Sequence, residues 1–233
     1  MRIAGTQGDS SLGEYTLKPI QLVTAKEQIK NVLRDAILSN EFKRGDTLNV
    51  AEIANQLGVS AMPVREALSV LERDGLVELR PRKTAVVLGA DEQYIRDYYR
   101  IRALLEGEAA LQASIRGGEK TDTLRRILEI SAQACEENDL QLFSEMNTAF
   151  HQTIGEMSGN RRLELMLKDL WMSKAILQRS YTGDDMHRTA KAHEHIAQCI
   201  FEKRGEDARK AMGDHLNDGL KVLLRQFNEG NKV

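Results

Sequence analysis

Apolar residues recur at helical spacing from Ala25 onward, after an opening segment that is polar and has no period. The first apolar stripe consists of Ile29, Val32, Leu33, Ala36 and Ile37. Residues at these separations lie on one face of a helix, so the stripe predicts an amphipathic helix of about four turns that ends near the turn at residues 43–46. Residues 1–21 are predicted to be a flexible lead-in, because polar, glycine-containing segments rarely pack.

Two short helices are predicted next, each with a starting signal of its own. Asn49 stands at an N-cap position, with Glu52 three residues later, and Gly58 marks the end of this helix. Ser60 is placed to cap the following helix in the same way. The apolar stripe of that second helix is Val64, Ala67, Leu68 and Leu71. The pair therefore has the size and spacing of a helix-turn-helix.

After Gly75 the helical period stops and two short apolar runs take its place. Residues 76–79 and 85–88 predict the two strands of a hairpin around the basic turn at residues 80–84. The order helix, helix, turn, helix and hairpin is that of a winged helix-turn-helix. We therefore predict a domain of this kind over residues 22–90.

Beyond Asp91 the pattern is helical throughout and shows no strand signal. It breaks at Gly117-Gly118, Asn138-Asp139, Gly159-Asn160, Gly183-Asp184 and Gly205-Glu206. These breaks divide residues 91–229 into about six helices with short connections, which suits an antiparallel bundle. The predicted fold is therefore mainly α, with an N-terminal winged helix-turn-helix followed by an antiparallel bundle of about six helices.

Composition limits the class of protein. A hydrophobic fraction of 41% with 29% charged residues is that of a soluble globular protein, and the sequence shows neither an apolar run long enough for a membrane span nor a secretory leader. We expect a cytoplasmic protein with no membrane partner. Cys135 and Cys199 form no CxxC or CxxH pattern, so neither a disulfide framework nor a thiolate metal site is predicted. The net charge of −2 argues against a uniformly basic nucleic-acid coat, yet residues 18–90 hold 11 Lys and Arg against 9 Asp and Glu.

The predicted recognition helix has an outer face that suits the major groove of DNA. Arg65 can make a bidentate contact with guanine or bind a phosphate, and the free N–H groups at the start of the helix also favour phosphate. The hairpin tip concentrates positive charge where a wing meets the DNA backbone or minor groove. The predicted DNA-contacting residues are Ser60, Met62, Arg65, Glu66, Arg80, Arg82, Lys83 and Thr84. The pattern alone leaves other folds open, because short amphipathic helices with glycine turns are common.

Three predicted helices of the second domain each turn a histidine toward the core. His151, His193 and His215 fall on the apolar stripes of three different helices. A buried imidazole needs a partner, and several converging imidazoles are best satisfied by a metal ion, such as zinc at about 2.0–2.1 Å. For one histidine taken singly, a hydrogen bond to a carbonyl or to water is the simpler explanation. His187 and His195 lie off these stripes, so they are predicted to lie at the surface or to contact the metal ligands without binding the metal themselves.

Residues 22–90 resemble the GntR family of winged-helix regulators. The segments that carry the resemblance follow one another in order and without gaps: Arg44-Gly45-Asp46-Thr47-Leu48, residues 51–60 (AEIANQLGVS), residues 63–71 (PVREALSVL) and Asp74-Gly75-Leu76-Val77. The family usually has Arg where this chain has Ala61, which leaves more of the base reading to Arg65. It usually has Gly where this chain has Thr84, and a β-branched residue resists a positive φ, so the geometry of the wing tip is in question.

Residues 91–229 resemble the all-helical ligand-binding domain, of the FCD type, in the FadR-like subgroup of that family. The matching landmarks are residues 99–106 (YRIRALLE), Asn147-Thr148-Ala149-Phe150-His151, Gly159-Asn160, His193 and His215. The resemblance implies a divalent metal site formed by Asn147, His151, His193 and His215. Asn147 replaces the Asp that is usual in the family, and its amide oxygen brings no negative charge. Zinc is expected, with nickel and manganese as alternatives.

The same resemblance implies an effector site. An arginine at the position of Arg102 reaches the cavity in this subgroup and pairs with an anionic effector, since a buried guanidinium favours a bidentate acid. The alternative is a structural salt bridge between Arg102 and Glu106, its neighbour at i+4.

Together these patterns predict a homodimeric transcription regulator, expected to be a repressor, that binds a palindromic operator in double-stranded DNA. A small carboxylate or sugar acid bound beside the metal is expected to control it. The alternative is a helical-bundle metal-binding protein or metalloenzyme. None of the five histidines follows a Glu by three positions, and the chain has no HExxH, GxSxG or Walker-type motif, so no enzyme activity is expected. An architectural protein would have no need of inward-facing imidazoles.

Overall fold

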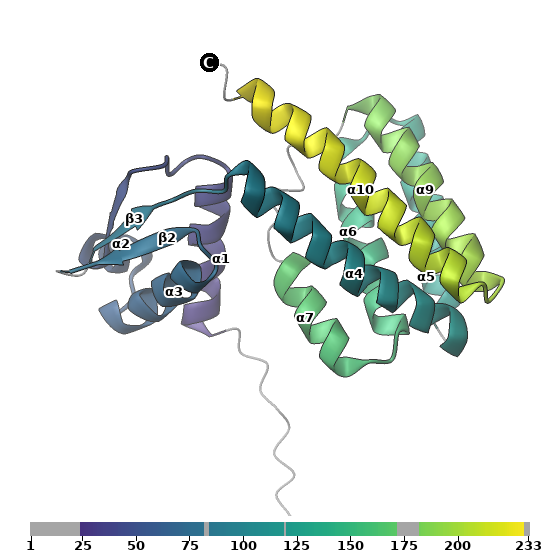
Figure 1. Ribbon diagram of the computed structural model, residues 1–233, viewed down its shortest axis with the longest axis horizontal. Helices are drawn as coiled ribbons and strands as arrows, with labels where there is room; N and C mark the ends of the chain where they lie inside the picture. The colour runs from purple at the N-terminus through teal and green to yellow at the C-terminus, as the bar shows by residue number, and fades with distance from the viewer. Residues whose placement is uncertain (1–23, 82–83, 119, 172–181, 231–233) are drawn as a thin grey trace, which may run out of the picture.

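The computed structural model describes residues 24–81, 84–118, 120–171 and 182–230, and it confirms the mainly α fold. A small N-terminal domain of helices and a three-stranded sheet precedes a larger helical domain, and the long helix α4 (Glu92–Arg116) leads from one into the other (Figure 1). No described helix combines the length and the apolar character that crossing a lipid bilayer requires.

The N-terminal domain is built on the helices α1 (Ala25–Leu38), α2 (Val50–Leu57) and α3 (Ala61–Arg73). Asn49 caps α2 as expected, because its Oδ1 accepts a hydrogen bond from the N–H of Ala51 at 2.8 Å. Ser60 precedes α3 in an extended conformation, but its side chain makes no capping hydrogen bond, contrary to expectation. The predicted apolar stripe of α3 is fully buried, and its members are Val64, Ala67, Leu68 and Leu71. The opposite face of α3 is therefore free to meet a ligand.

An antiparallel sheet in the order β1-β3-β2 forms the wing. Its strands are β1 (Thr47–Asn49), β2 (Val77–Arg80) and β3 (Thr84–Val87). The two predicted strands match β2 and β3 to within one residue, whereas β1 is missed because three residues are too few to show an alternating pattern. Thr84 pairs with Asn49 and Arg80 at the start of β3 and is not among the residues with a positive φ. Its β-branched side chain therefore brings no backbone strain to the wing.

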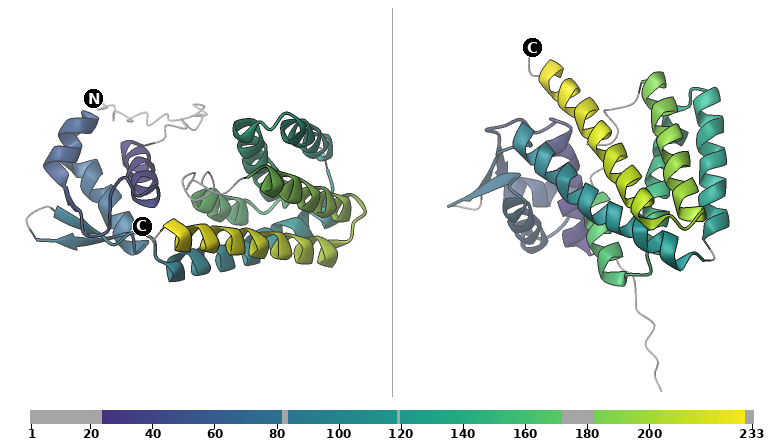
Figure 2. Two further views of the ribbon diagram at one scale, coloured as in Figure 1. Left: turned by 90° about the horizontal axis from the view of Figure 1, so that it is seen from above. Right: turned by 45° about the vertical axis from the view of Figure 1, so that its right-hand side comes forward.

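The described part of the C-terminal domain holds six helices, which are α4, α5 (Thr121–Glu136), α6 (Leu140–Met157), α7 (Arg161–Trp171), α9 (Gly183–Phe201) and α10 (Gly205–Gly230). Helices α4 and α10 run antiparallel along each other, and α5, α6 and α9 form a second layer against them (Figures 1 and 2). Three of the five predicted breaks fall between these helices, and the other two, Gly183-Asp184 and Gly205-Glu206, are the first two residues of α9 and of α10. Because α6, α9 and α10 turn their apolar stripes to a common core, side chains far apart in the sequence meet there.

Candidate functional site

Three histidine side chains meet in the core of the C-terminal domain. His151 comes from α6, His193 from α9 and His215 from α10. The Nε2 atom of His215 lies 3.3 Å from Nε2 of His193 and 3.3 Å from Nε2 of His151, and the three candidate ligand atoms all lie within 4.8 Å of one another. Two nitrogens bound to one tetrahedral zinc ion at about 2.0–2.1 Å are about 3.3 Å apart. The spacing therefore suits a metal ion held by imidazoles.

The protein environment keeps two of these imidazoles neutral. Burial, together with the neighbouring His215 and His151, holds the pKa of His193 well below its usual value. Burial, together with His151 and Arg102, lowers the pKa of His215 to about 3. A neutral imidazole has a lone pair available for a metal ion. The protein environment therefore favours the protonation state of His193 and His215 that can bind a metal.

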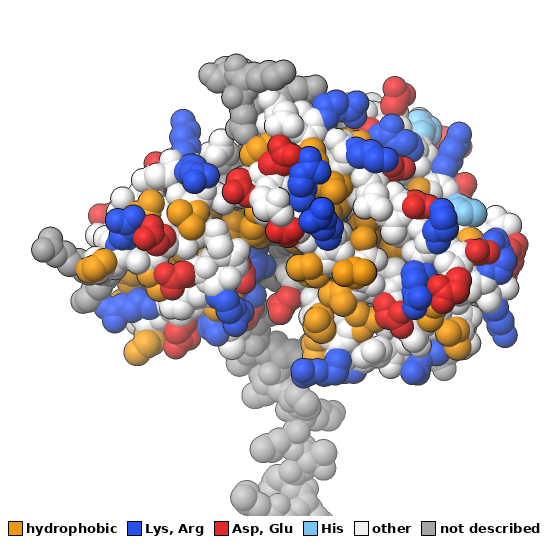
Figure 3. Space-filling view, viewed as in Figure 1, with side chains coloured by type: hydrophobic (Ala, Val, Ile, Leu, Met, Phe, Trp, Pro, Cys, Tyr) orange, Lys and Arg blue, Asp and Glu red, His pale blue; other side chains and the backbone are white. Residues whose placement is uncertain are grey.

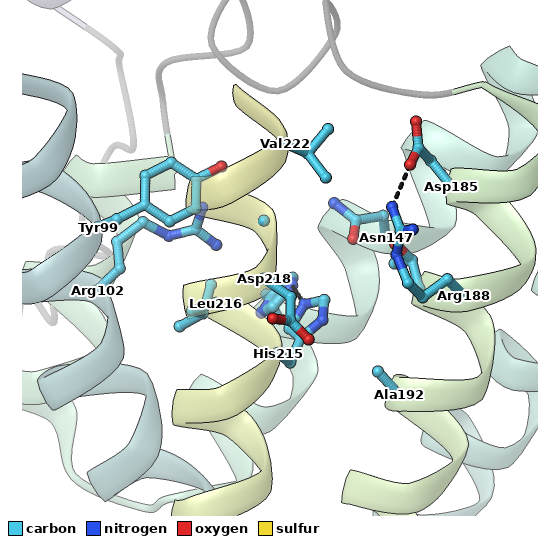
Figure 4. A pocket seen from close by; sticks show the side chains of 13 residues that line it. Tyr99, Arg102, Asn147, Asp185, Arg188, Ala192, His215, Leu216, Asp218 and Val222 are labelled. Carbon is cyan, nitrogen blue, oxygen red and sulfur yellow. Dashed lines mark hydrogen bonds and ion pairs between the residues drawn. The ribbon is translucent and has the colours of Figure 1, made fainter. Parts of the chain in front are cut away.

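Asn147 lies one turn before His151 on α6 and is 3% exposed. Its Oδ1 is buried and has no hydrogen-bond partner among the residues that the structure describes. Leaving a buried acceptor unpaired costs about 1–3 kcal/mol, and a cation beside the imidazoles would satisfy it. Asn147 lines one pocket with His151 and His215 (Figure 4). The four residues expected to form a metal site are thus in one region of the core.

The carboxylate of Glu106, which was predicted from the sequence only as a partner of Arg102, orients one of the imidazoles. Its Oε2 lies 2.5 Å from Nδ1 of His151, and its Oε1 accepts hydrogen bonds from Arg102 Nε at 2.6 Å and Trp171 Nε1 at 3.1 Å. Burial alone would raise the pKa of Glu106, but the charge of Arg102 and the hydrogen bonds from His151 and Arg102 hold it below its usual range. A carboxylate at Nδ1 favours the tautomer in which His151 turns the lone pair of Nε2 toward the other histidines.

Arg102 takes part in both arrangements considered from the sequence. It is 1% exposed and forms the buried salt bridge with Glu106 through Nε. It also lines the pocket beside the histidines, and no hydrogen bond among the described residues uses its terminal nitrogens. Figure 4 shows Arg102 and Tyr99 of α4 on one side of this pocket and the paired Asp185 and Arg188 of α9 on the other. The terminal nitrogens of Arg102 can therefore bind an acid without breaking its bond to Glu106.

The outer face of α3 presents the predicted reading residues. Arg65 and Glu66 are exposed, Met62 is 62% exposed, and Ser60 is exposed just before the helix. The free N–H groups of the first turn lie at this end of α3, where a helix attracts phosphate. This face has the character that a recognition helix requires.

The wing lies next to α3 in the N-terminal domain (Figure 1). Arg80 at the end of β2 is exposed and pairs with Glu78 at 2.8 Å. Thr84 is half-buried, and its hydroxyl donates to the carbonyl of Pro81 at 3.4 Å. The remaining predicted wing contacts, Arg82 and Lys83, lie outside the described residues.

Two family models match the chain. The model described as "Bacterial regulatory proteins, gntR family" matches residues 25–87, and the FCD domain model matches residues 97–218. FCD domains commonly bind metal ions, which agrees with the cluster of three histidines. Both models describe parts of transcription regulators and not of enzymes, as expected from the sequence.

Individual relatives support the same assignment. The uncharacterized HTH-type transcriptional regulator YdhC of Bacillus subtilis is 29% identical over 88% of this chain and 93% of its own length. The HTH-type transcriptional repressor RspR of Escherichia coli is 26% identical over 94% of this chain and 96% of its own. The solved structure of Escherichia coli McbR/YncC has a TM-score of 0.69 and 23% identity, covering 88% of this chain and all of that one, and it supports the fold. With both models matching in this order, the chain belongs to the GntR family of DNA-binding transcription regulators, among the members that carry a C-terminal FCD domain.

Proposed function

We propose that this regulator is a homodimeric repressor whose affinity for a palindromic operator is controlled by a small carboxylate or sugar acid bound beside a divalent metal ion. The observation that carries the proposal is the cluster of His151, His193 and His215, because two of its members, His151 and His215, line a pocket that Arg102 also lines. Repression is supported by relatives such as RspR, which is named a repressor. Such a protein would act in the cytoplasm, where bacterial DNA lies.

Zinc is the first candidate for the metal. Its preferred donors include imidazole nitrogen, and the 3.3 Å spacings match its tetrahedral coordination. Asn147 would supply an oxygen ligand without charge, so nickel and manganese stay as alternatives. A metal here would hold α6, α9 and α10 together and attract an acid to the pocket.

Arg188, Asp185 and Asp218 also line the pocket, but each of them is already paired with an opposite charge. The pocket suits an anionic effector because two further positive groups would face it. The terminal nitrogens of Arg102 are one, and a metal ion at the histidines would be the other. An Arg fork binds a carboxylate through two parallel hydrogen bonds, and divalent metals accept carboxylate oxygen as a ligand. A small acid with more than one oxygen group could contact both.

We infer that α3 reads DNA through Arg65, with Ser60, Met62 and Glu66 beside it and the wing on the adjoining backbone. Two recognition helices about 34–36 Å apart in a dimer would read a palindrome. Exposed apolar side chains of α4 and α7 support a contact between two copies, and they gather in the lower middle of the face in Figure 3. The large apolar side chains of these two helices that are exposed are Ile101, Leu104, Ile115, Leu165 and Met166.

The Arg65→Ala variant should bind operator DNA more weakly by about 1–3 kcal/mol, because it loses a bidentate base or phosphate contact. Fluorescence anisotropy with DNA from the protein's own promoter region measures the loss at several salt concentrations. Arg73→Ala removes the same charge from the far end of α3 and should change affinity little. Equal affinities of the two variants would contradict the assignment of α3 as the reading helix.

The Glu106→Gln variant should bind zinc about 10–100-fold more weakly, because an amide no longer fixes the tautomer of His151. Competition with a chromophoric chelator measures this affinity, and metal analysis gives the stoichiometry. The matched control is Glu108→Gln, which changes a partly exposed carboxylate on the same helix that pairs with Arg209. Wild-type affinity in Glu106→Gln would argue against a metal at these histidines.

The metal-free protein should lose stability as the pH falls. Unfolded histidines protonate near pH 6.5, whereas the lowered pKa values of His193 and His215 keep both neutral in the folded state to much lower pH. Below about pH 6.5 the unfolded state therefore takes up protons that the folded state does not. The free energy of unfolding falls by up to about 1.4 kcal/mol per pH unit for each of them.

Urea unfolding in the presence of a chelator, at a series of pH values between 7 and the pKa of His215 near 3, measures this slope. His215→Gln should give a shallower slope, and His195→Gln, at an exposed histidine of α9, should leave it unchanged. If all three proteins share one slope, the two buried imidazoles are not the cause.

The Arg102→Lys variant should lose its response to the effector, because lysine keeps the charge beside Glu106 but has no fork for an acid. A thermal-shift screen of organic and sugar acids against zinc-loaded protein identifies stabilising acids, and a ligand at 100 times its Kd adds about 2.7 kcal/mol. Arg100→Lys, at an exposed position of the same helix, is the control. An acid that stabilises Arg102→Lys as strongly as wild type does not use Arg102.

A further inference from the structure

The last three residues of α7, residues 169–171, each contact a different part of the molecule. The indole N–H of Trp171 donates to Oε1 of Glu106 at 3.1 Å, and the other oxygen of that carboxylate lies against a histidine of the cluster. The carbonyl of Leu170 accepts a hydrogen bond from the hydroxyl of Tyr98 on α4 at 2.6 Å. Figures 1 and 2 show α7 on the side of the helical domain that faces α1. One helix end thus touches the histidine site, α4 and the N-terminal domain.

The contacts with the N-terminal domain are made by Asp169. Its carbonyl accepts from Nη1 of Arg34 at 3.5 Å, and its carboxylate lies 3.7 Å from Nζ of Lys30. Both cations belong to α1 and are at least nine-tenths buried, although the carboxylate of Asp169 is itself largely exposed. Arg34 also forms a 2.6 Å salt bridge with Asp74, the residue that ends α3. Arg34 therefore links the end of α7 to the end of the recognition helix, because it contacts both Asp169 and Asp74.

Trp171 is held tightly on the side of the histidines. A Cβ atom on Gly155 would lie 2.6 Å from Cη2 of the indole, closer than two such atoms approach in proteins. Gly155 follows His151 by one turn on α6, so the indole packs against the helix that carries His151 while it bonds to Glu106 of α4. A shift between α4 and α6 must therefore displace the indole.

The contacts within each domain are short and those between the domains are long. His151 to Glu106 is 2.5 Å and Arg34 to Asp74 is 2.6 Å, whereas Asp169 meets the two cations at 3.5 and 3.7 Å. Hydrogen bonds weaken steeply at such lengths, and each cation has a closer partner within its own domain, which is Glu27 at 2.5 Å for Lys30 and Asp74 at 2.6 Å for Arg34. Asp169 therefore adds a second, weaker contact to each cation. The negative end of the α7 dipole adds to the attraction of Asp169 for both cations. The joint between the domains can therefore open or close with a small movement.

We propose that the end of α7 couples occupation of the histidine site to the orientation of the recognition helix. A filled site fixes His151 and Glu106, which fixes Trp171 and keeps Asp169 against Lys30 and Arg34. An empty site lets the indole move and releases the N-terminal domain. Coupling of this kind requires that the ligand prefer one of two domain arrangements. The inference rests on the proposed metal site and adds the route by which it acts.

Hydrogen–deuterium exchange of the full-length protein tests this route, with zinc as the ligand. In wild type, saturating zinc should slow exchange in α7 and also in α1 and α3. In Trp171→Phe, which keeps an aromatic ring but loses the N–H, zinc should still bind and the slowing in α1 and α3 should be lost. Asp169→Asn removes the charge that faces Lys30 but keeps the backbone carbonyl that Arg34 contacts, so the slowing should persist in α7 and be reduced in α1 and α3. Arg162→Ala, at an exposed position of α7, should behave as wild type.

The outcomes separate the two proposals. If wild type binds zinc and exchange in α1 and α3 does not change, the coupling is wrong and the metal site stands. If Trp171→Phe and Asp169→Asn both keep the full wild-type response, the route through α7 is wrong. If wild type takes up no zinc, the proposed metal site is wrong and the coupling is overturned with it.

Discussion

A single buried carboxylate, that of Glu106, sets the geometry of the C-terminal domain. Burying an ionised carboxylate is unfavourable unless it is surrounded by donors and opposite charge. Glu106 meets this requirement through Arg102 on its own helix, His151 of α6 and Trp171 of α7. Three helices must therefore keep a fixed arrangement around one side chain. Removal of any donor leaves a charge that the apolar surroundings cannot accommodate.

The histidine cluster has the opposite chemistry to the surroundings of Glu106. Donors surround the carboxylate of Glu106, whereas the cluster brings together groups that offer lone pairs. Three imidazoles and the oxygen of Asn147 gather beside one pocket, and this oxygen has no hydrogen-bond partner among the described residues. A bound cation makes this arrangement favourable, because the lone pairs of the imidazoles and of the Asn147 oxygen would all coordinate it. Binding energy at such a site adds directly to the stability of the folded arrangement. A sensor domain built in this way is expected to be more rigid when it is filled.

Periodicity predicted most of the fold because the helices are long and amphipathic. The helix-turn-helix, the hairpin and the bundle followed from spacing and turn residues, and the stripes of three helices indicated that His151, His193 and His215 face inward. The strand β1 was missed because it is three residues long, and the side chain of Ser60 does not cap although its position suggested it.

The sequence could not give the double role of Arg102 or the part played by Trp171. Spacing at i+4 indicated the bond between Arg102 and Glu106, and the family resemblance implied that Arg102 reaches a cavity, but the two were alternatives and neither indicated that one side chain does both. Trp171 lies 65 residues from Glu106, and no local pattern links two residues at that separation. The unusual feature that could have drawn attention to it is Gly155 within a helix, since glycine weakens a helix and is kept where another side chain approaches closely.

A regulator of this design needs a rigid sensor, a rigid reader and a weak joint between them. If the joint were as strong as the bonds within each domain, a ligand could not provide enough differential binding energy to change the arrangement, since a shift from 1:99 to 99:1 needs about 5.5 kcal/mol. If the joint had no contacts, the state of the sensor would not reach the reader. The long contacts of Asp169 with Lys30 and Arg34 lie between these limits. They place the adjustable part of the molecule at one helix end, where a small displacement makes or breaks a second contact of two buried cations that already pair with Glu27 and Asp74.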